Sequence, residues 1–206
     1  MTSRGPRADE AAWPAQVSAQ LGRSAVGVGC VVVRCHLGLP VVLWMPPRLP
    51  DGTPFPTRHW LTCPLLHRRV AALEAAGWVR RLEARRAEDP AFGRALRAAH
   101  ERERTARAEE LRRLGGEVSG PPSEPLRRGG VGGARTGVKC LHAHLASYLA
   151  GDRANPVGEA VHEVLGEPRC ERPCVVPEPS GGRWRRNPAW RPITARSSGS
   201  DGAWRE

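Results

Sequence analysis

Hydrophobic and polar positions follow two different periods along the chain, and these periods predict its elements. β-Branched runs at 26–35 and 40–44 flank a short turn, which is typical of a β-hairpin. Elsewhere apolar residues recur at helical spacing. The helices predicted in this way cover residues 9–22, 63–76, 78–88, 90–114, 138–150 and 156–165. A small antiparallel hairpin or sheet packed by several helices is an α+β fold.

Two regions lack either period. Residues 115–137 contain eight Gly and three Pro, the composition of a flexible linker or a long loop. From residue 167 to residue 206 Pro, Gly, Ser and Arg dominate, and such a segment buries too little apolar area to offset the entropy lost on ordering. We therefore expect one α+β domain over residues 1–166, with a Gly-rich linker at 115–137, and a disordered tail over 167–206.

The net charge of +11 is carried almost wholly by arginine, since Lys139 is the one lysine among 32 basic residues. So complete a preference for arginine is typical of a GC-rich genome, and it weakens the case that the charge serves nucleic-acid binding. Glutamates also interleave with the helical arginines, as on a solvated surface. The stretch from Arg183 to Arg191, with Trp184 and Trp190, is where we predict a non-specific nucleic-acid contact. A protein partner is a further possibility that the sequence leaves open.

The chain shows no segment that predicts a membrane span or an export signal. Its longest apolar runs, 25–33 and 39–45, fall well short of the roughly 18–20 residues that cross a bilayer. The first 13 residues contain acidic side chains and no apolar core of a signal peptide. We expect a cytoplasmic protein, whose six cysteines are then thiols or metal ligands rather than disulfides.

Four residues are predicted to hold a metal ion. Cys35 ends the first strand, and Cys63 begins a helix, where the helix dipole lowers the pKa of a thiol. Cys140 and His144 are four residues apart and share a face if both lie within the helix. Three thiolates and an imidazole suit tetrahedral zinc and could also hold an iron–sulfur cluster. His142 falls in the apolar stripe and is predicted to be a buried hydrogen-bonding residue, but the two histidines exchange roles if the helix begins only after Cys140.

A second hypothesis is an enzyme that uses the same groups. Cys63 or Cys140 would be the thiolate nucleophile, with His144 as the base and Asp51 nearby. Asp51, Thr53 and Thr57 belong to the proline-rich segment Pro50–Thr57, which is either a ligand-binding loop or a rigid set of turns. Phosphate-binding loops and the common hydrolase motifs are missing from the sequence, which weakens the case for a nucleotide-binding protein.

The other cysteines are predicted to have no chemical role. Cys30 lies among valines and is expected in the core. Cys170 and Cys174 fall in the expected tail, outside any folded frame.

Three groups of residues resemble a known family. They are Arg34-Cys35 with Gly38 and Pro40; Arg48–Thr57 with Trp60–Pro64; and Lys139–Ala146 with Asn155–Gly158. In this order and spacing they resemble the bacterial domain-of-unknown-function family 501, over roughly Val17 to Gly166. The resemblance implies no particular activity. It strengthens the metal hypothesis, because the predicted ligands fall inside the family's motifs.

Overall fold

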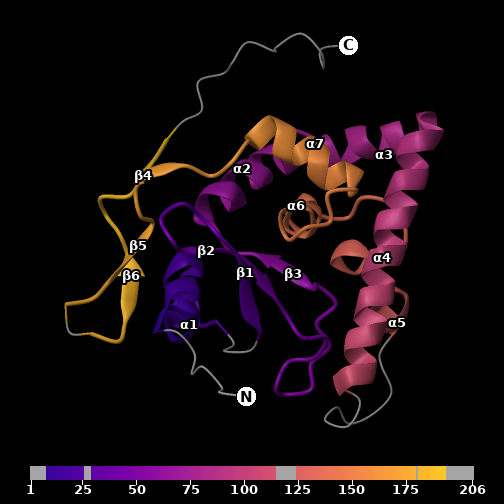
Figure 1. The fold of residues 1–206 in the computed structure, drawn as a ribbon. Coiled ribbons are helices and arrows are strands. Elements are labelled where there is room, and N and C mark those ends of the chain that lie inside the picture. Colours follow the sequence, from indigo (N-terminus) through magenta and orange to yellow (C-terminus); the bar gives the residue numbers. More distant parts are fainter. Residues whose placement is uncertain (1–7, 26–28, 115–123, 180, 194–206) are drawn as a thin grey trace.

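The predicted hairpin is the first half of a three-stranded antiparallel sheet. The computed structural model describes residues 8–25, 29–114, 124–179 and 181–193 (Figure 1). Strands β1 (Cys30–Arg34), β2 (Pro40–Trp44) and β3 (His59–Leu61) pair in the order β1-β2-β3. The turn between β1 and β2 closes through Cys35 N–H to the Leu39 carbonyl at 2.9 Å, and Gly38 supplies its positive φ of 75°. With its seven helices among the described residues, the fold is α+β as predicted.

β2 is the central strand and is buried on both faces. Helix α1 (Ala8–Leu21) covers one face with Trp13 and Val17, which pack against Leu43 and Met45 of the sheet. The edge strand β1 is more exposed, and Cys30 at its start is exposed rather than in the core. The prediction for Cys30 was wrong because an edge strand leaves part of its surface uncovered.

Three helices follow the sheet at the predicted places. They are α2 (Pro64–Ala75), α3 (Trp78–Glu88) and α4 (Pro90–Leu114). Pro64 opens α2, where its missing N–H costs nothing. Gly77, with φ at 83°, turns the chain from α2 into α3. The Asp89 carboxylate accepts hydrogen bonds from Ala91 N–H and Phe92 N–H and so caps the start of α4.

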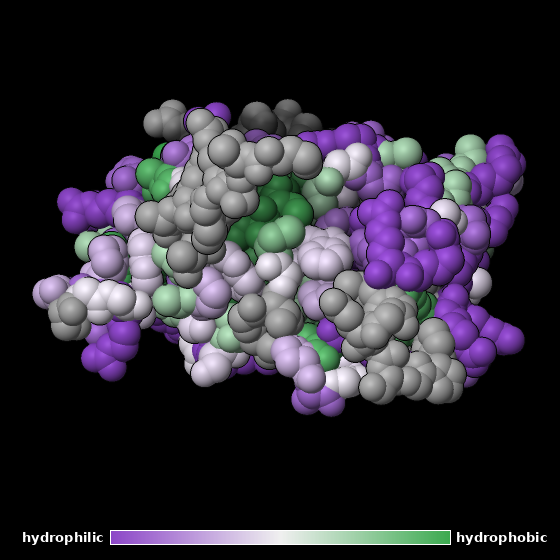
Figure 2. All heavy atoms as spheres, turned by 60° about the horizontal axis from the view of Figure 1, so that its bottom comes forward, coloured by the Kyte–Doolittle hydropathy of each residue, from purple (hydrophilic) through white to green (hydrophobic). Residues whose placement is uncertain are grey.

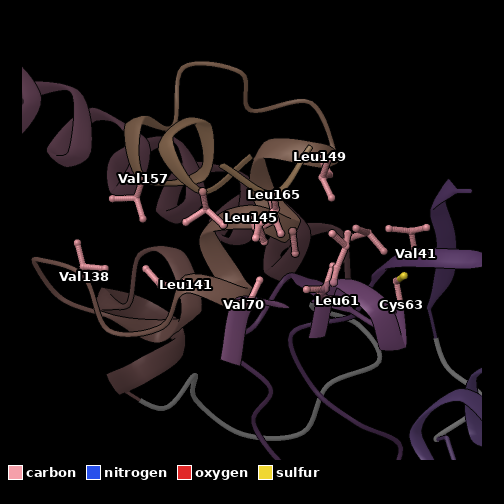
Figure 3. Packing of buried hydrophobic residues seen from close by; sticks show 14 of the residues in the cluster. Val41, Leu61, Cys63, Val70, Val138, Leu141, Leu145, Leu149, Val157 and Leu165 are labelled. Atoms are coloured by element: carbon pink, nitrogen blue, oxygen red, sulfur yellow. The ribbon is translucent and has the colours of Figure 1, made fainter. Parts of the chain in front are cut away.

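Helix α6 (Leu141–Leu149) lies at the centre of the molecule, between the sheet and α7 (Pro156–Leu165) (Figure 1). Most of its side chains are buried because neighbours cover it on several sides. Figure 3 shows the cluster around Leu145, with Cys63 and Val41 at one end and Leu141 at the other. This core joins α6 and α7 to α2 and to the sheet.

The expected Gly-rich linker is largely folded. Helix α5 (Glu124–Arg128) and a short 3-10 turn at Val131–Gly133 pack against α4, while residues 115–123 lie outside the described part. Arg107 of α4 is buried and donates hydrogen bonds to the carbonyls of Gly129 and Pro56. A backbone carbonyl of this segment is therefore hydrogen-bonded to a buried side chain of α4, which the Gly-rich composition could not predict. Outward-facing residues of α4 remain charged, and Figure 2 shows hydrophilic side chains gathered on that side of the molecule.

Part of the expected tail is folded. Four short strands form two antiparallel ribbons, β4 with β7 and β5 with β6. Their bounds are Cys170–Arg172, Val175–Pro177, Trp184–Arg186 and Arg191–Pro192 for β4 to β7. β5 and β6 pack against α1. The prediction of disorder was wrong for these strands, and residues 194–206 lie outside the described part. Among the described helices, none combines the length and the apolar character that a bilayer crossing requires.

Candidate metal centre

The start of α6 decides which side chains meet. The helix begins at Leu141, and Cys140 is its N-cap residue with an extended backbone (φ −153°, ψ 118°). Cys140 therefore does not share a helical face with His144. Its sulfur lies instead 3.9 Å from Nδ1 of His142.

Glu74, near the end of α2, completes a group of three. Its Oε1 lies 3.3 Å from His142 Nδ1, and the ligand atoms of Glu74, Cys140 and His142 all lie within 4.8 Å of one another. No other three Cys, His, Asp or Glu residues in the described part of the chain converge in this way. Around a tetrahedral zinc ion the nitrogen and oxygen ligands are about 3.4 Å apart, and nitrogen and sulfur about 3.6 Å, for the usual bond lengths. The two observed separations from His142 Nδ1, 3.3 Å to the oxygen and 3.9 Å to the sulfur, lie close to these values.

Hydrogen bonds hold Glu74 and His142 in place. Leu141 N–H donates to Glu74 Oε1 at 2.8 Å, so the carboxylate sits at the N-terminus of α6, where the helix dipole favours negative charge. His142 Nε2 lies 3.2 Å from the His67 carbonyl and can only donate to it. That bond leaves the lone pair of the neutral ring on Nδ1, the atom that faces Glu74 and Cys140. A histidine oriented by a carbonyl in this way is typical of metal ligands.

The centre is half-buried, with side-chain exposures of 30% for Glu74 and 18% for His142. Burial alone would lower the pKa of His142. The hydrogen bond that the protonated ring donates to Cys140 and the charge of the Glu74 carboxylate together outweigh that effect, and the pKa of His142 is raised above its usual value. The Nδ1 position therefore attracts a positive charge, and a proton or a metal cation can supply it. His67, whose ring centroid lies 4.4 Å from that of His142, has a lowered pKa, mainly because it is partly buried.

A comparison with protein families finds one match, to the family described as "Protein of unknown function (DUF501)", over residues 31–163. The chain belongs to the DUF501 family. Comparisons with curated proteins and with solved structures give no match. The DUF501 match spans all three residues of the centre, as well as Cys35 and Cys63, and ends before β4.

The four ligands predicted from the sequence lie in separate places in this DUF501 fold. No three of them have ligand atoms within 4.8 Å of one another. Cys63 precedes α2 and Glu74 lies near the end of that helix, about 16 Å further along its axis. Figure 3 likewise shows Cys63 and Leu141 at opposite ends of the core. Cys35 and Cys63 line a small pocket at the N-terminal end of α2, whereas Cys140 lies at the other end.

The helix start does not make Cys63 a thiolate. Burial raises the pKa of the Cys63 thiol to about 12, and the N–H groups of Leu66 and Leu65 only partly oppose that increase. The predicted lowering was wrong because loss of solvation outweighs the helix dipole at this buried site. An enzyme that relies on Cys63 as a free nucleophile therefore loses its physical support.

His144, rather than His142, is the buried hydrogen-bonding histidine of α6. His144 is fully buried, and its Nδ1 lies 3.1 Å from Oδ1 of Asn155, which also accepts a hydrogen bond from Gly158 N–H. Burial lowers the pKa of His144 to about 4, so the ring is neutral near pH 7. It joins α6 to the start of α7 and lies apart from the centre.

The proline-rich loop is a set of turns bonded to itself. The Asp51 carboxylate accepts a hydrogen bond from Thr53 N–H at 2.9 Å, and Leu49 N–H donates to the Thr53 carbonyl. None of Asp51, Thr53 and Thr57 lines the cysteine pocket. These contacts favour the rigid-turn interpretation, and a ligand-binding role for the three residues stays a prediction.

The basic stretch near the C-terminus is folded. Trp184 is part of β6, and the Trp190 ring lies 4.4 Å from the Arg68 guanidinium in a cation–π contact. Arg183 pairs with Glu178 at 3.0 Å. Nucleic-acid binding through this stretch stays a prediction, with Trp190 already in contact with a cation of the same chain.

Glu74 and His67 are the residues that sequence reasoning missed. They are seven apart, which places them on one face of α2, two turns from each other. A spacing of seven residues is common in helices and does not by itself indicate a site. It points to one only once the structure shows that α6 packs against α2.

Proposed function

We propose that the chain is a metal-binding module that holds one zinc ion at Glu74, Cys140 and His142. The observation that supports this most directly is the orientation of His142, whose Nδ1 lone pair faces a carboxylate and a thiol. In a metal-free neutral state two acceptors, Nδ1 and Glu74 Oε1, face each other at 3.3 Å. A cation between them removes that conflict.

The donor set favours zinc over other common ions. A thiolate and an imidazole disfavour magnesium and calcium, which prefer oxygen ligands. A single cysteine is too few for an iron–sulfur cluster, which needs several thiolates. Three protein ligands leave a fourth position of tetrahedral zinc for water or for a group from a binding partner. Such a site suits a binding or regulatory module, which is the role we assign to it.

Metal content tests this assignment. The full chain is expressed without a chelating tag, dialysed, and analysed for bound metals by mass spectrometry. Cys140→Ser and His142→Asn are each expected to lose one equivalent of zinc relative to the wild type. His162→Asn is the matched control, because His162 also faces a carboxylate, Glu167, at 3.6 Å but has no thiol beside it. Folding of every variant is checked by circular dichroism.

Cobalt substitution gives a second, independent measurement. Co²⁺ bound by a cysteine shows a sulfur-to-metal charge-transfer band, so the part of that band due to this centre should vanish in Cys140→Ser and persist in His162→Asn. Folded Cys140→Ser and His142→Asn proteins with the full wild-type metal content would refute the proposal.

A further inference from the structure

Four cysteines from separate segments converge on the pocket at the N-terminal end of α2. Cys35 follows β1, Cys63 precedes α2, Cys170 begins β4, and Cys174 lies between β4 and β5. All four line this pocket, and all are free thiols. The six cysteines of the chain thus divide into four at this pocket, one at the Glu74 centre and one exposed on β1.

Three of the four sulfurs at the pocket have N–H donors next to them. Trp190 Nε1 donates to Cys170 Sγ at 3.3 Å, and Gln20 Nε2 donates to Cys174 Sγ at 3.6 Å. The first N–H groups of α2, those of Leu65 and Leu66, face Cys63. Neutral thiols are weak acceptors and gain little from such donors, whereas thiolates gain much. This arrangement is the one expected around the sulfurs of a metal-bound cysteine cluster.

Without a bound cation, the lining of the pocket disfavours a negatively charged thiolate. Apart from Gln20 and His36, the rest of the lining is mostly apolar, with Leu39 and Leu65 among its members. An isolated thiolate is unstable there, and burial raises the pKa of both Cys63 and Cys174. A divalent cation changes this balance because it deprotonates its thiol ligands outright. The Arg68 guanidinium over the Trp190 ring adds positive charge close by.

The spacing of the ligands is also that of a structural zinc site. Cys170 and Cys174 have three residues between them, within the usual C-x₂₋₄-C range. Cys35 adjoins a tight hairpin turn, and Cys63 adjoins a helix start. In the described structure no three of these sulfurs lie within 4.8 Å of one another, so the ion must draw them inward. Cys170 begins β4, which pairs only with the two-residue strand β7 among the described strands, and Cys174 lies in the connection between β4 and β5, so neither cysteine is part of the three-stranded sheet.

We propose that Cys35, Cys63, Cys170 and Cys174 form a second metal site, in which four thiolates hold a structural zinc ion. On binding, four S–H bonds break, four Zn–S bonds form, and four protons pass to the solvent. Two ligands lie next to β1 and α2, inside the family match, and the other two come from β4 and the connection that follows it, beyond the match. The ion fastens the segment from Cys170 to Cys174 to the end of β1 and the start of α2, and this link is independent of the Glu74 centre.

The test counts metal site by site in the full chain. Zinc alone is the probe, added to reduced, metal-stripped wild type, Cys170→Ser, Cys174→Ser, Cys140→Ser and Cys30→Ser proteins. Cys170 and Cys174 are chosen because they are only half-buried, so their variants should fold. Cys30 is exposed and on the same sheet, which makes it the matched control. We expect two equivalents in the wild type and in Cys30→Ser, and the loss of one equivalent in each of Cys170→Ser, Cys174→Ser and Cys140→Ser.

Cobalt and protease distinguish the two sites. Charge-transfer absorption grows with the number of thiolate ligands, so Cys174→Ser should remove a larger share of it than Cys140→Ser. Removal of zinc should speed tryptic cleavage after Arg169 in the wild type. Cys170→Ser and Cys174→Ser proteins that keep both equivalents would overturn the inference and leave the Glu74 centre intact. A wild-type mass lower by two hydrogens after aerobic purification, with one of these cysteines in a disulfide that zinc does not displace, would also overturn it.

Discussion

Oε1 of Glu74 lies 3.3 Å from Nδ1 of His142, and the other ring nitrogen of His142 is committed to the His67 carbonyl. The Glu74 oxygen also accepts Leu141 N–H at 2.8 Å, so it belongs both to the start of α6 and to the imidazole. Two helices that are far apart in the sequence thus meet at one carboxylate. In the proposed site a proton and a zinc ion would compete for the space between the two residues.

The first prediction concerns that proton. The pKa of His142 is raised in the folded protein, so protonation stabilises the fold below the unfolded value of 6.5, and this stabilisation is lost as pH rises through the folded value. Glu74→Gln removes the negative charge and should lower the pKa of His142, as followed by NMR titration of its ring protons in metal-stripped protein. Zinc affinity should rise with pH in the same range, because the metal displaces this proton. A His142 pKa unchanged by Glu74→Gln would contradict the proposed contact.

The second prediction concerns two arginines on α4. Arg107 is buried, with Glu103 at 3.0 Å, while Arg102 pairs with Asp152 at the surface at 2.7 Å. Arg107→Met leaves a buried carboxylate without its partner and should lower the free energy of unfolding by about 3–5 kcal/mol. Arg102→Met, the matched control, should cost less than about 1 kcal/mol, because solvent screens the exposed pair. Urea unfolding of both variants measures the difference, and equal costs would contradict the burial argument.

Much of the fold follows from the sequence because periodicity reports burial directly. The hairpin, α2, α3 and α4 lie where apolar spacing and the turn at Gly77 predict them. The 124–137 segment was misjudged because glycine content indicates conformational freedom and says nothing about a buried partner. Arg107 is that partner, because it donates hydrogen bonds to the carbonyls of Gly129 and Pro56. No local sequence pattern predicts these hydrogen bonds.

The ligand set predicted from the sequence depended on the residue at which helix α6 begins. Cys140 and His144 share a helical face only if Cys140 is inside the helix, and the helix begins one residue later. Helix ends are the least certain part of any sequence-based assignment. Glu74 could not be found at all, because its role arises from the crossing of α2 and α6. Local propensity can place a side chain on a face, but only packing decides which faces meet.

The third prediction tests the contact between α6 and α7. A Cβ atom at Gly158 would lie 2.5 Å from the His144 carbonyl oxygen and 2.5 Å from Tyr148 Cβ. Gly158→Ala gains about 1 kcal/mol of helix propensity, yet it should destabilise the protein by about 1–2 kcal/mol net, because overpacking costs more. Glu159→Ala, at the exposed neighbouring position, should change stability by less than about 0.5 kcal/mol. A stabilised Gly158→Ala protein in thermal unfolding would show that the two helices can separate freely.

The fourth prediction follows from the neutral state of His144. Burial lowers its pKa to about 4 in the folded protein, below the unfolded value of 6.5. Between these values the unfolded chain binds the extra proton, so stability is present above pH 6.5 and is lost as pH falls. His144 alone should account for about 3 kcal/mol of the loss between pH 7 and pH 4. His144→Leu removes the titrating ring, so its urea-unfolding free energy should fall less steeply with acid than that of the wild type. Parallel pH profiles for the two proteins would mean that His144 is protonated in the fold, and its hydrogen bond to Asn155 would then be that of an imidazolium.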